Sequence, residues 1–259
     1  MKQPLIMPTD LPVGGYDAAF EKDLEEIERR NSRRSFYDFY PNKGPLRREL
    51  YPKHLEFFEA GATYRERCFM AANRVGKTVG GGGYEMTCHL SGDYPWWWKG
   101  RRWDRPIAAW AAGKTNETTR DIIQRKLLGK ITGAGTSKKG VDGTGLIPGH
   151  LVGQPSWKQN VDNFVDIIPV QHISGGWSEL GFKSYQQGSG SFEGTERDVI
   201  WLDEECDIDI YGECLVRTAG TTGAGSGGMI MLTFTPLLGL SEVVLSFMPA
   251  EDQPGYGEI

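Results

Sequence analysis

The chain has 259 residues, 39% of them hydrophobic, which is enough for one large α/β domain or two small ones. Its formal net charge of -5 argues against a uniformly basic coat for nucleic acid, and no apolar run approaches the roughly 18 residues of a membrane helix. The four cysteines form no Cys-x-x-Cys pair, so the sequence predicts neither a disulfide framework nor a zinc site.

The first fifty residues predict an arm that precedes the main domain. Residues 17–31 carry apolar side chains at helical spacing with charges between them, which is typical of a short amphipathic helix. An aromatic stretch follows, and a second helix is predicted to begin within 51–58. We therefore divide the chain into a helical or extended arm, 1–50, and one domain, 51–259.

The segment 67–78 predicts a phosphate-binding loop. It reads R-C-F-M-A-A-N-R-V-G-K-T, an apolar run followed by a turn that ends in Gly76-Lys77-Thr78. A loop around a triphosphate needs converging backbone N–H groups, a lysine ammonium, and a hydroxyl that binds Mg²⁺. Ala71 stands where such loops usually begin with glycine, and residues 113–115 repeat the Gly-Lys-Thr triplet after another apolar run. The triplet by itself is therefore a weak signal.

An acidic strand further along the chain favours the first triplet. Residues 199–204, V-I-W-L-D-E, read as a buried strand that ends in Asp203 and Glu204. Such a strand can lie beside the phosphate loop in a parallel sheet, where its acidic end would hold Mg²⁺ and an attacking water. Adjacent side chains at a strand end point in different directions, so one carboxylate can face the metal and the other the γ-phosphate.

Apolar runs that alternate with helical patterns predict an α/β fold with a mostly parallel central sheet flanked by helices. The predicted strands are 67–72, 107–112, 164–170, 179–185, 199–203 and 229–235. The predicted helices follow the phosphate loop and occupy 116–128 and 208–218. Four glycines, 80–83, fall in the first of these helices, where each costs about 1 kcal/mol relative to alanine. That helix therefore either packs very closely on the sheet or is kinked.

Charge is distributed unevenly along the chain. Residues 120–139 include six basic and one acidic residue, whereas 193–209 include eight acidic and one basic residue. The basic segment can contact DNA phosphates or form an ordinary solvated helix face. Residues 96–103 mix tryptophans with basic residues, which suits unstacked bases. We favour local packing for this segment, because double-stranded DNA offers few unstacked bases.

Three motifs in order resemble those of the ATPase domain of the large terminase subunit, the DNA-packaging motor of tailed bacteriophages and herpesvirus-like capsids. They are A-A-N-R-V-G-K-T, 71–78; S-F-E-G-T-E-R-D-V-I-W-L-D-E-E, 191–205; and L-T-F-T-P-L-L-G, 232–239. The resemblance covers about 51–244. It implies a P-loop NTPase fold of the ASCE type, which is a three-layer sandwich.

The resemblance also implies roles for individual residues. Lys77 would bind the β- and γ-phosphates, and Thr78 and Asp203 would hold Mg²⁺. Glu204 would polarise the attacking water, and Arg74 would stabilise developing charge. The residues implied to contact the nucleotide are Ala72, Asn73, Arg74, Val75, Gly76, Lys77, Thr78, Tyr51 and His54.

Three further assignments depend on the same resemblance. Thr233 and Thr235 lie in the segment similar to the coupling motif, where they would sense the γ-phosphate and relay its loss. His54 stands where the family commonly has an adenine-contacting glutamine, so stacking by Tyr51 can matter more for the base. Arg217 is the candidate for an arginine that acts on a neighbouring subunit, and a surface salt bridge is its alternative role. Arg101 or Arg102 can also reach such a neighbour.

The implied activity is Mg²⁺-dependent ATP hydrolysis that drives double-stranded DNA into a procapsid. The implied partners are DNA, the portal protein, the small terminase subunit and copies of the chain in a ring, a pentamer by resemblance. We expect a monomer in isolation, no membrane, and a place in the host cytoplasm and transiently at the portal vertex, but not in the mature virion. We also expect the nuclease domain of the family, and its activity, to be absent from this chain.

Two other readings remain open. A different P-loop enzyme, such as a helicase-like DNA-dependent ATPase or a small-molecule kinase, would share the phosphate loop. The adjacent Asp203 and Glu204 count against a kinase, which need not keep a water-polarising glutamate. A catalytically silent nucleotide-binding assembly module would bind ATP without hydrolysing it.

Overall fold

A seven-stranded sheet forms the centre of the computed structural model, which describes residues 35–136, 138–220, 227–237 and 239–248. The strand order is β1-β9-β8-β2-β7-β6-β5. The first five strands of this order run parallel to one another, while β6 and β5 are antiparallel additions. The predicted helix at 17–31 lies outside the described residues.

All six predicted strands occur within two residues of their expected bounds. They are β1 (Glu66–Met70), β2 (Ala108–Gly113), β6 (Val165–Gln171), β7 (Trp177–Ser184), β8 (Val199–Asp203) and β9 (Met229–Phe234). The sequence did not predict the short strand β5 (Ser156–Trp157) or the small second sheet of β3 (Ile131–Thr132) and β4 (Gly140–Val141).

The acidic strand lies in the same parallel sheet as the phosphate-loop strand, and the sequence left the order of the strands open. β9 pairs with both β1 and β8 and separates them. All six residues of β9 are buried, as expected for a strand with neighbours on both edges and helices on both faces. The end of β9 therefore lies between the phosphate loop and the acidic end of β8.

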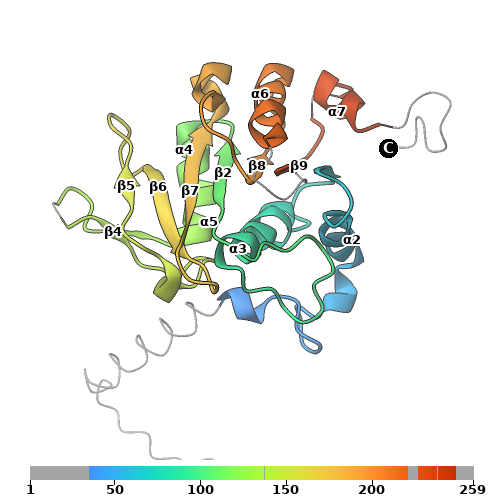
Figure 1. Cartoon of the computed structure of the whole chain (residues 1–259), viewed down its shortest axis with the longest axis horizontal. Coiled ribbons are helices and arrows are strands. Elements are labelled where there is room, and N and C mark those ends of the chain that lie inside the picture. Colours follow the sequence, from blue (N-terminus) through green and yellow to red (C-terminus); the bar gives the residue numbers. More distant parts are fainter. Residues whose placement is uncertain (1–34, 137, 221–226, 238, 249–259) are drawn as a thin grey trace, which may run out of the picture.

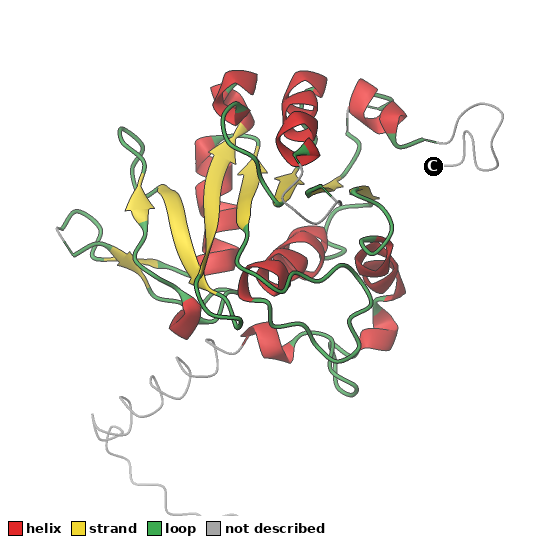
Figure 2. Ribbon diagram, in the orientation of Figure 1, coloured by secondary structure: helices red, strands yellow, loops and turns green. Residues whose placement is uncertain are grey.

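Helices cover both faces of the sheet and produce the predicted three layers (Figures 1 and 2). One buried apolar cluster joins the sheet to α2, α3 and the helix that ends in α5, and a second joins the opposite face to α6 and α7. The α-helices are α2 (Pro52–Ala60), α3 (Tyr84–Ser91), α4 (Asn116–Thr118), α5 (Arg125–Leu128), α6 (Ile208–Ala219) and α7 (Glu242–Ser246). Within the described ranges, every helix is too short or too polar to cross a bilayer.

Two helices change their winding along their length. The helix after the phosphate loop begins as the π-helical turn η3 (Lys77–Gly83) and continues as α3. The predicted helix at 116–128 runs through α4, the π-helical turn η4 (Thr119–Gln124) and α5. Short 3₁₀ turns are η1 (Ser35–Asp38), η2 (Arg48–Leu50), η5 (Gly149–Leu151), η6 (Tyr185–Gln187) and η7 (Ser189–Phe192).

Of the two alternatives that the sequence left open for the four consecutive glycines, the structure confirms close packing on the sheet, in a turn that is π-helical. A Cβ atom at Gly82 would lie 2.2 Å from Trp201 Nε1, and one at Gly81 would lie 3.3 Å from a ring carbon of Phe69. The approach at Gly82 leaves no room for a side chain, and the approach at Gly81 is tighter than an ordinary van der Waals contact. The glycines thus bring the start of the helix directly against β8 and β1.

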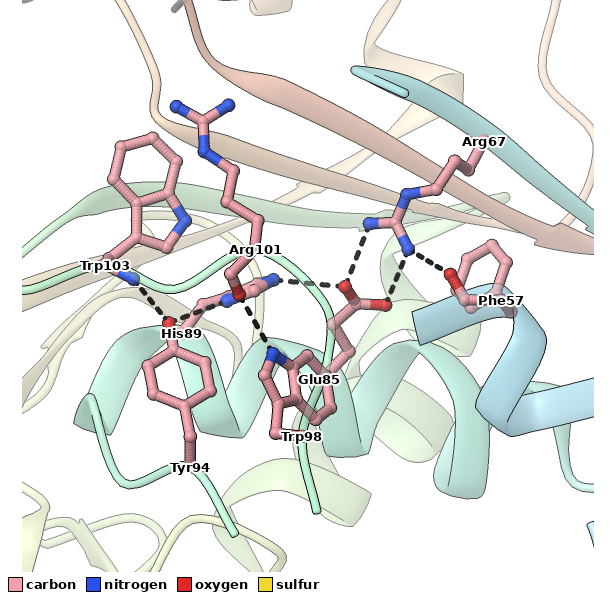
Figure 3. Close-up of polar contacts among 8 residues, drawn as sticks. All are labelled: Phe57, Arg67, Glu85, His89, Tyr94, Trp98, Arg101 and Trp103. Atoms are coloured by element: carbon pink, nitrogen blue, oxygen red, sulfur yellow. Dashed lines mark hydrogen bonds and ion pairs between the residues drawn. The ribbon is translucent and has the colours of Figure 1, made fainter. Parts of the chain in front are cut away.

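A buried polar network fixes α3 to its neighbours (Figure 3). Arg67 of β1 donates to both Glu85 carboxylate oxygens, at 2.9 and 3.1 Å, and to the Phe57 carbonyl of α2 at 2.5 Å. His89 Nε2 lies 3.2 Å from the same carboxylate, which is fully buried. Because burial lowers the pKa of His89, the neutral ring donates through Nε2 and accepts the Tyr94 hydroxyl at Nδ1.

The tryptophan-rich segment packs locally, as expected. Trp98 stacks on Phe58 with ring centroids 5.0 Å apart, and its indole N–H donates to the Arg101 carbonyl at 3.0 Å. Trp103 is also buried, and the Arg101 guanidinium lies 4.1 Å from its ring centroid. Trp96, by contrast, is 78% exposed.

Candidate nucleotide site

The phosphate loop connects β1 to η3 and faces solvent. Residues 72–76 are exposed, and the chain turns through left-handed conformations at Arg74 and Gly76, with φ of 67° and 87°. The Lys77 ammonium lies inside the turn, 2.8 Å from the Ala71 carbonyl and 2.7 Å from the Ala72 carbonyl. The Lys77 ammonium, which would neutralise phosphate charge, is therefore held within a loop that a ligand can reach from solvent.

Thr78 and Asp203 lie together at the carboxyl edge of the sheet. The Thr78 hydroxyl is 3.1 and 3.2 Å from the two carboxylate oxygens of Asp203. Asp203 is 3% exposed, and burial raises its pKa to about 7. A hydroxyl and a carboxylate are hard oxygen ligands of the kind that Mg²⁺ prefers. Because the Asp203 carboxylate is buried, water does not solvate its negative charge, and a bound cation would stabilise that charge. Thr78 and Asp203 therefore fit the predicted Mg²⁺ site.

Thr233 of β9 forms hydrogen bonds with two residues of β8, Asp203 and Trp201. Its hydroxyl donates to Asp203 Oδ1 at 2.6 Å and accepts from Trp201 Nε1 at 2.7 Å. Trp201 is the same ring that lies against Gly82. The orientation of the Asp203 carboxylate is thus set by a chain of contacts that ends at the phosphate-loop helix.

Thr235 touches the phosphate loop directly. Its hydroxyl lies 2.8 Å from the Lys77 ammonium, 2.9 Å from the Ala71 carbonyl and 2.9 Å from Asn73 Oδ1. Because β9 separates β1 from β8, Thr233 within β9 contacts Asp203, and Thr235 just after its end contacts the phosphate loop. This geometry suits the predicted coupling role of Thr233 and Thr235.

Glu204 leaves the strand in a strained conformation. Its φ is 70°, its amide donates to the Thr233 carbonyl at 3.0 Å, and its side chain is exposed. The Tyr185 hydroxyl lies 2.8 Å from the Asp203 carbonyl and 3.1 Å from the Glu204 carbonyl. The adjacent carboxylates therefore diverge as the sequence suggested, one buried beside Thr78 and the other free to face a ligand.

Backbone strain is concentrated around this site. Five non-glycine residues among the described ones have positive φ, and two of them are asparagines, which tolerate that conformation. The other three are Tyr40, Arg74 and Glu204, each at a cost of about 1–3 kcal/mol. Such strain persists only where surrounding contacts determine the conformation, which marks the loop and the strand end as a built site.

His54 is placed differently from the expected adenine contact. It is 4% exposed, its Nε2 lies 3.0 Å from the Val75 carbonyl, and its Nδ1 lies 2.5 Å from the Tyr40 hydroxyl. Both ring nitrogens are therefore engaged inside the protein. Tyr51 packs against His54 with ring centroids 5.3 Å apart and is half-buried, so its role at the base stays a prediction.

Arg217 lies near the amino end of β8, whereas Lys77 lies near the carboxyl ends of the parallel strands. Its carbonyl accepts from the Arg197 amide just ahead of β8, whereas Asp203 ends that strand. Its guanidinium donates to the Gly194 carbonyl and lies 3.7 Å from Glu213. Action on a neighbouring subunit stays a prediction for this residue.

The second Gly-Lys-Thr triplet forms no phosphate loop. Gly113 is the last residue of β2, and Thr115 is the N-cap of α4, with its hydroxyl accepting from the Thr118 amide at 3.1 Å. A capping threonine after a strand explains this triplet fully.

Comparisons with known proteins agree with the motifs. The family model "Terminase large subunit, T4likevirus-type, N-terminal" matches residues 68–256. The chain is 36% identical over 251 residues to the terminase large subunit of Salmonella phage P22, with 89% of this chain and 46% of that protein covered. It thus spans about half the length of that relative.

A solved structure of the large terminase ATPase domain of Thermus phage P74-26 aligns with a TM-score of 0.45 and 14% identity, covering 81% of this chain and 79% of that one. The family model covers residues 68–256, which is most of the chain. The chain belongs to the terminase large subunit family, and it matches the N-terminal region that the T4likevirus-type model describes.

Proposed function

We propose that the chain is the ATP-hydrolysing motor domain of a terminase large subunit, which drives double-stranded DNA into a procapsid. The observation that carries the proposal is the meeting of Lys77, Thr78 and Asp203 at one edge of the sheet, with Glu204 exposed beside them. Phosphoryl transfer depends on positioning and charge stabilisation rather than on covalent chemistry by the protein. Each of these residues supplies one part of that task.

The residues divide the reaction between them. The loop amides and the Lys77 ammonium bind and neutralise the phosphates. Thr78 and Asp203 would hold Mg²⁺, which would neutralise part of the negative charge of the phosphates. The exposed Glu204 carboxylate orients the attacking water, and Arg74, in the loop itself, stabilises charge that develops on the transferred group.

In this proposal, loss of the γ-phosphate changes the contacts of Thr233, in β9, and of Thr235, just after its end. Lys77 gives up its carbonyl contacts when it turns to phosphate, and Thr235 contacts both Lys77 and the loop. A change at Lys77 therefore reaches β9, and through Thr233 it reaches Asp203. We propose this strand end as the element that couples hydrolysis to movement.

The partners follow from the proposed role. They are double-stranded DNA, the portal protein, the small terminase subunit, and further copies of the chain in a ring at the portal vertex. Pentameric stoichiometry, a monomeric state in isolation, and a transient place in the host cytoplasm outside the mature virion belong to the same proposal. Family membership supports a role in DNA packaging, and the individual partners, the stoichiometry and the location are proposed from that role.

Steady-state ATP hydrolysis with and without Mg²⁺ tests the chemistry. Lys77→Ala and Glu204→Gln should each lower turnover about 100-fold or more, since each removes a group that acts on the transition state. Lys114→Ala, in the second Gly-Lys-Thr triplet, is the matched control and should leave turnover unchanged. Equal activity of wild type and both site variants would refute the proposed ATPase.

Nucleic-acid dependence tests the motor assignment. Double-stranded DNA should stimulate turnover more than single-stranded DNA of the same length, because the proposed substrate is a duplex. Stimulation by single strands alone would favour a helicase-like enzyme, and ATP binding without hydrolysis would favour a silent assembly module.

A further inference from the structure

Two buried side chains, one of them in α2, hold the backbone of the phosphate loop and of the turn that follows it. We infer that Tyr40 and His54 are positioning residues that keep this loop in its phosphate-binding shape, an inference that rests on the proposed ATPase function. His54 Nε2 contacts the Val75 carbonyl at 3.0 Å, and the Tyr40 hydroxyl contacts the Gly80 carbonyl at 2.7 Å. The two side chains meet each other at 2.5 Å. Together they join the backbone on both sides of Lys77 and Thr78.

The two glycines of this segment show how closely the pair fits. A Cβ atom at Gly76 would lie 3.2 Å from His54 Cε1, and one at Gly80 would lie 2.8 Å from the Tyr40 hydroxyl oxygen. The backbone of the loop therefore packs directly on the two side chains without intervening atoms. Any displacement of the loop toward them is blocked, and displacement away breaks the hydrogen bonds.

The conformation of Tyr40 supports a functional constraint. Its φ is 56°, which is uncommon for an aromatic residue, and it shares this left-handed conformation with Arg74 and Glu204 at the site. Its ring is 2% exposed and lies among Tyr84, Phe58 and Trp97, with centroids 5.0 to 5.8 Å away. Packing on every side thus holds the hydroxyl at the Gly80 carbonyl.

Proton positions fix which way the bonds run. The Val75 carbonyl can only accept, so His54 Nε2 carries a proton and donates to it. Burial lowers the pKa of His54, and a neutral ring then leaves Nδ1 as an acceptor. The Tyr40 hydroxyl lies between two acceptors, Nδ1 and the Gly80 carbonyl, and its single proton serves the histidine and the phosphate-loop helix in turn.

Kinetics and hydrogen exchange of matched variants test the inference. Tyr40→Phe should raise the KM for ATP about fivefold, the effect of removing one hydrogen bond, and leave kcat within about twofold. It should also speed amide exchange in residues 72–78. Tyr84→Phe is the control, because it removes a hydroxyl from a buried ring that packs on Tyr40 yet makes no hydrogen bond to the loop among the described residues.

His54 variants separate loop positioning from base recognition. His54→Ala should raise the KM for ATP and GTP by the same factor, and His54→Gln, whose amide can still donate to Val75, should recover most of the loss. A change in the preference for ATP over GTP would instead assign His54 to the base and overturn the inference.

Failure of the inference can be told from failure of the proposed function. If the wild type does not hydrolyse ATP, the proposed function fails, while amide exchange in 72–78 still measures the loop. Exchange and KM that are the same in Tyr40→Phe and Tyr84→Phe would overturn the positioning role.

Discussion

Asp203 is deeply buried, and burial opposes the negative charge that a carboxylate needs in order to bind a metal ion. Its pKa is raised from the ordinary 3.8 to about 7, first of all by burial and despite the hydrogen bond from Thr233. In the metal-free protein the native state therefore binds a proton between these two pH values that the unfolded chain releases. Stability from this group should be greatest below pH 3.8 and fall as the pH rises toward 7.

The pH dependence gives the first residue-scale prediction. A difference of about three pKa units corresponds to about 4 kcal/mol, so metal-free wild type should lose up to that amount of unfolding free energy between pH 4 and pH 7 relative to Asp203→Asn. Denaturant unfolding at a series of pH values measures the difference. Asp209→Asn, an exposed carboxylate, is the control and should follow the wild type. Parallel curves for wild type and Asp203→Asn would show that the carboxyl titrates normally.

Residues within one short motif were predictable, and residues brought by tertiary packing were not. Lys77 and Thr78 follow from the loop itself, and Asp203 from a strand that ends in carboxylates. Tyr40, Tyr185 and Trp201 also shape the site, but each contacts it from far along the chain or through a buried face. Their only sequence signal was apolar or aromatic character, which ordinary core packing explains equally well.

At the scale of the element, the glycine turn of η3 should tolerate no side chain at Gly82. A Cβ atom there would lie 2.2 Å from Trp201 Nε1 and 2.3 Å from the adjacent ring carbon, so Gly82→Ala must move the indole or the helix. We expect a loss of about 1–3 kcal/mol of unfolding free energy. Trp201 also donates to Thr233, so ATP turnover should fall with it.

Gly212→Ala supplies the comparison for that variant. Gly212 lies inside α6, with nothing within 4 Å of a built Cβ atom. Alanine should therefore stabilise the helix by up to about 1 kcal/mol and leave turnover unchanged. If both alanine variants changed stability alike, close packing would not be the reason for glycine at Gly82.

Strands were easier to predict than their order. The apolar runs that became β2, β8 and β9 are continuous because both faces of each strand are buried, and local composition records that burial. Which strand lies next to which depends on pairing across the whole sheet, and nothing in the acidic strand itself records that β9 separates it from β1. The placement of Thr233 beside Asp203 followed only from that order.

At the scale of the whole molecule, a chain of net charge -5 carries three basic residues close together in α5 and just after it, and we call them the basic face. Arg125, Lys126 and Lys130 are exposed, and none forms an ion pair within the described part of the chain. Cavities of about 310 and 270 Å³ flank them, and both are lined by Arg125, Gly129 and Lys130. Val79 of η3 lines the second cavity. The π-helical turn that begins at Lys77 thus also lines a cavity beside the basic face.

The basic face should bind the phosphates of a DNA duplex. Replacing Arg125, Lys126 and Lys130 by alanine should weaken duplex binding and reduce the slope of log affinity against log salt by about one for each phosphate that the variant no longer neutralises. Fluorescence anisotropy with a labelled duplex, measured across a range of salt concentrations, gives both quantities. ATP turnover without DNA should be unchanged, because the three residues lie outside the nucleotide site.

A second triple variant with the same change in net charge distinguishes local phosphate binding from a general effect. Lys43, Lys53 and Lys99 are exposed elsewhere on the surface, and two of them already pair with glutamates. Their replacement by alanine should leave the salt slope close to that of the wild type. An equal fall in slope in the two triple variants would mean that DNA responds to the total charge of the domain and that the face around Arg125 has no special role, because only phosphate binding at a fixed position makes the location of a charge matter.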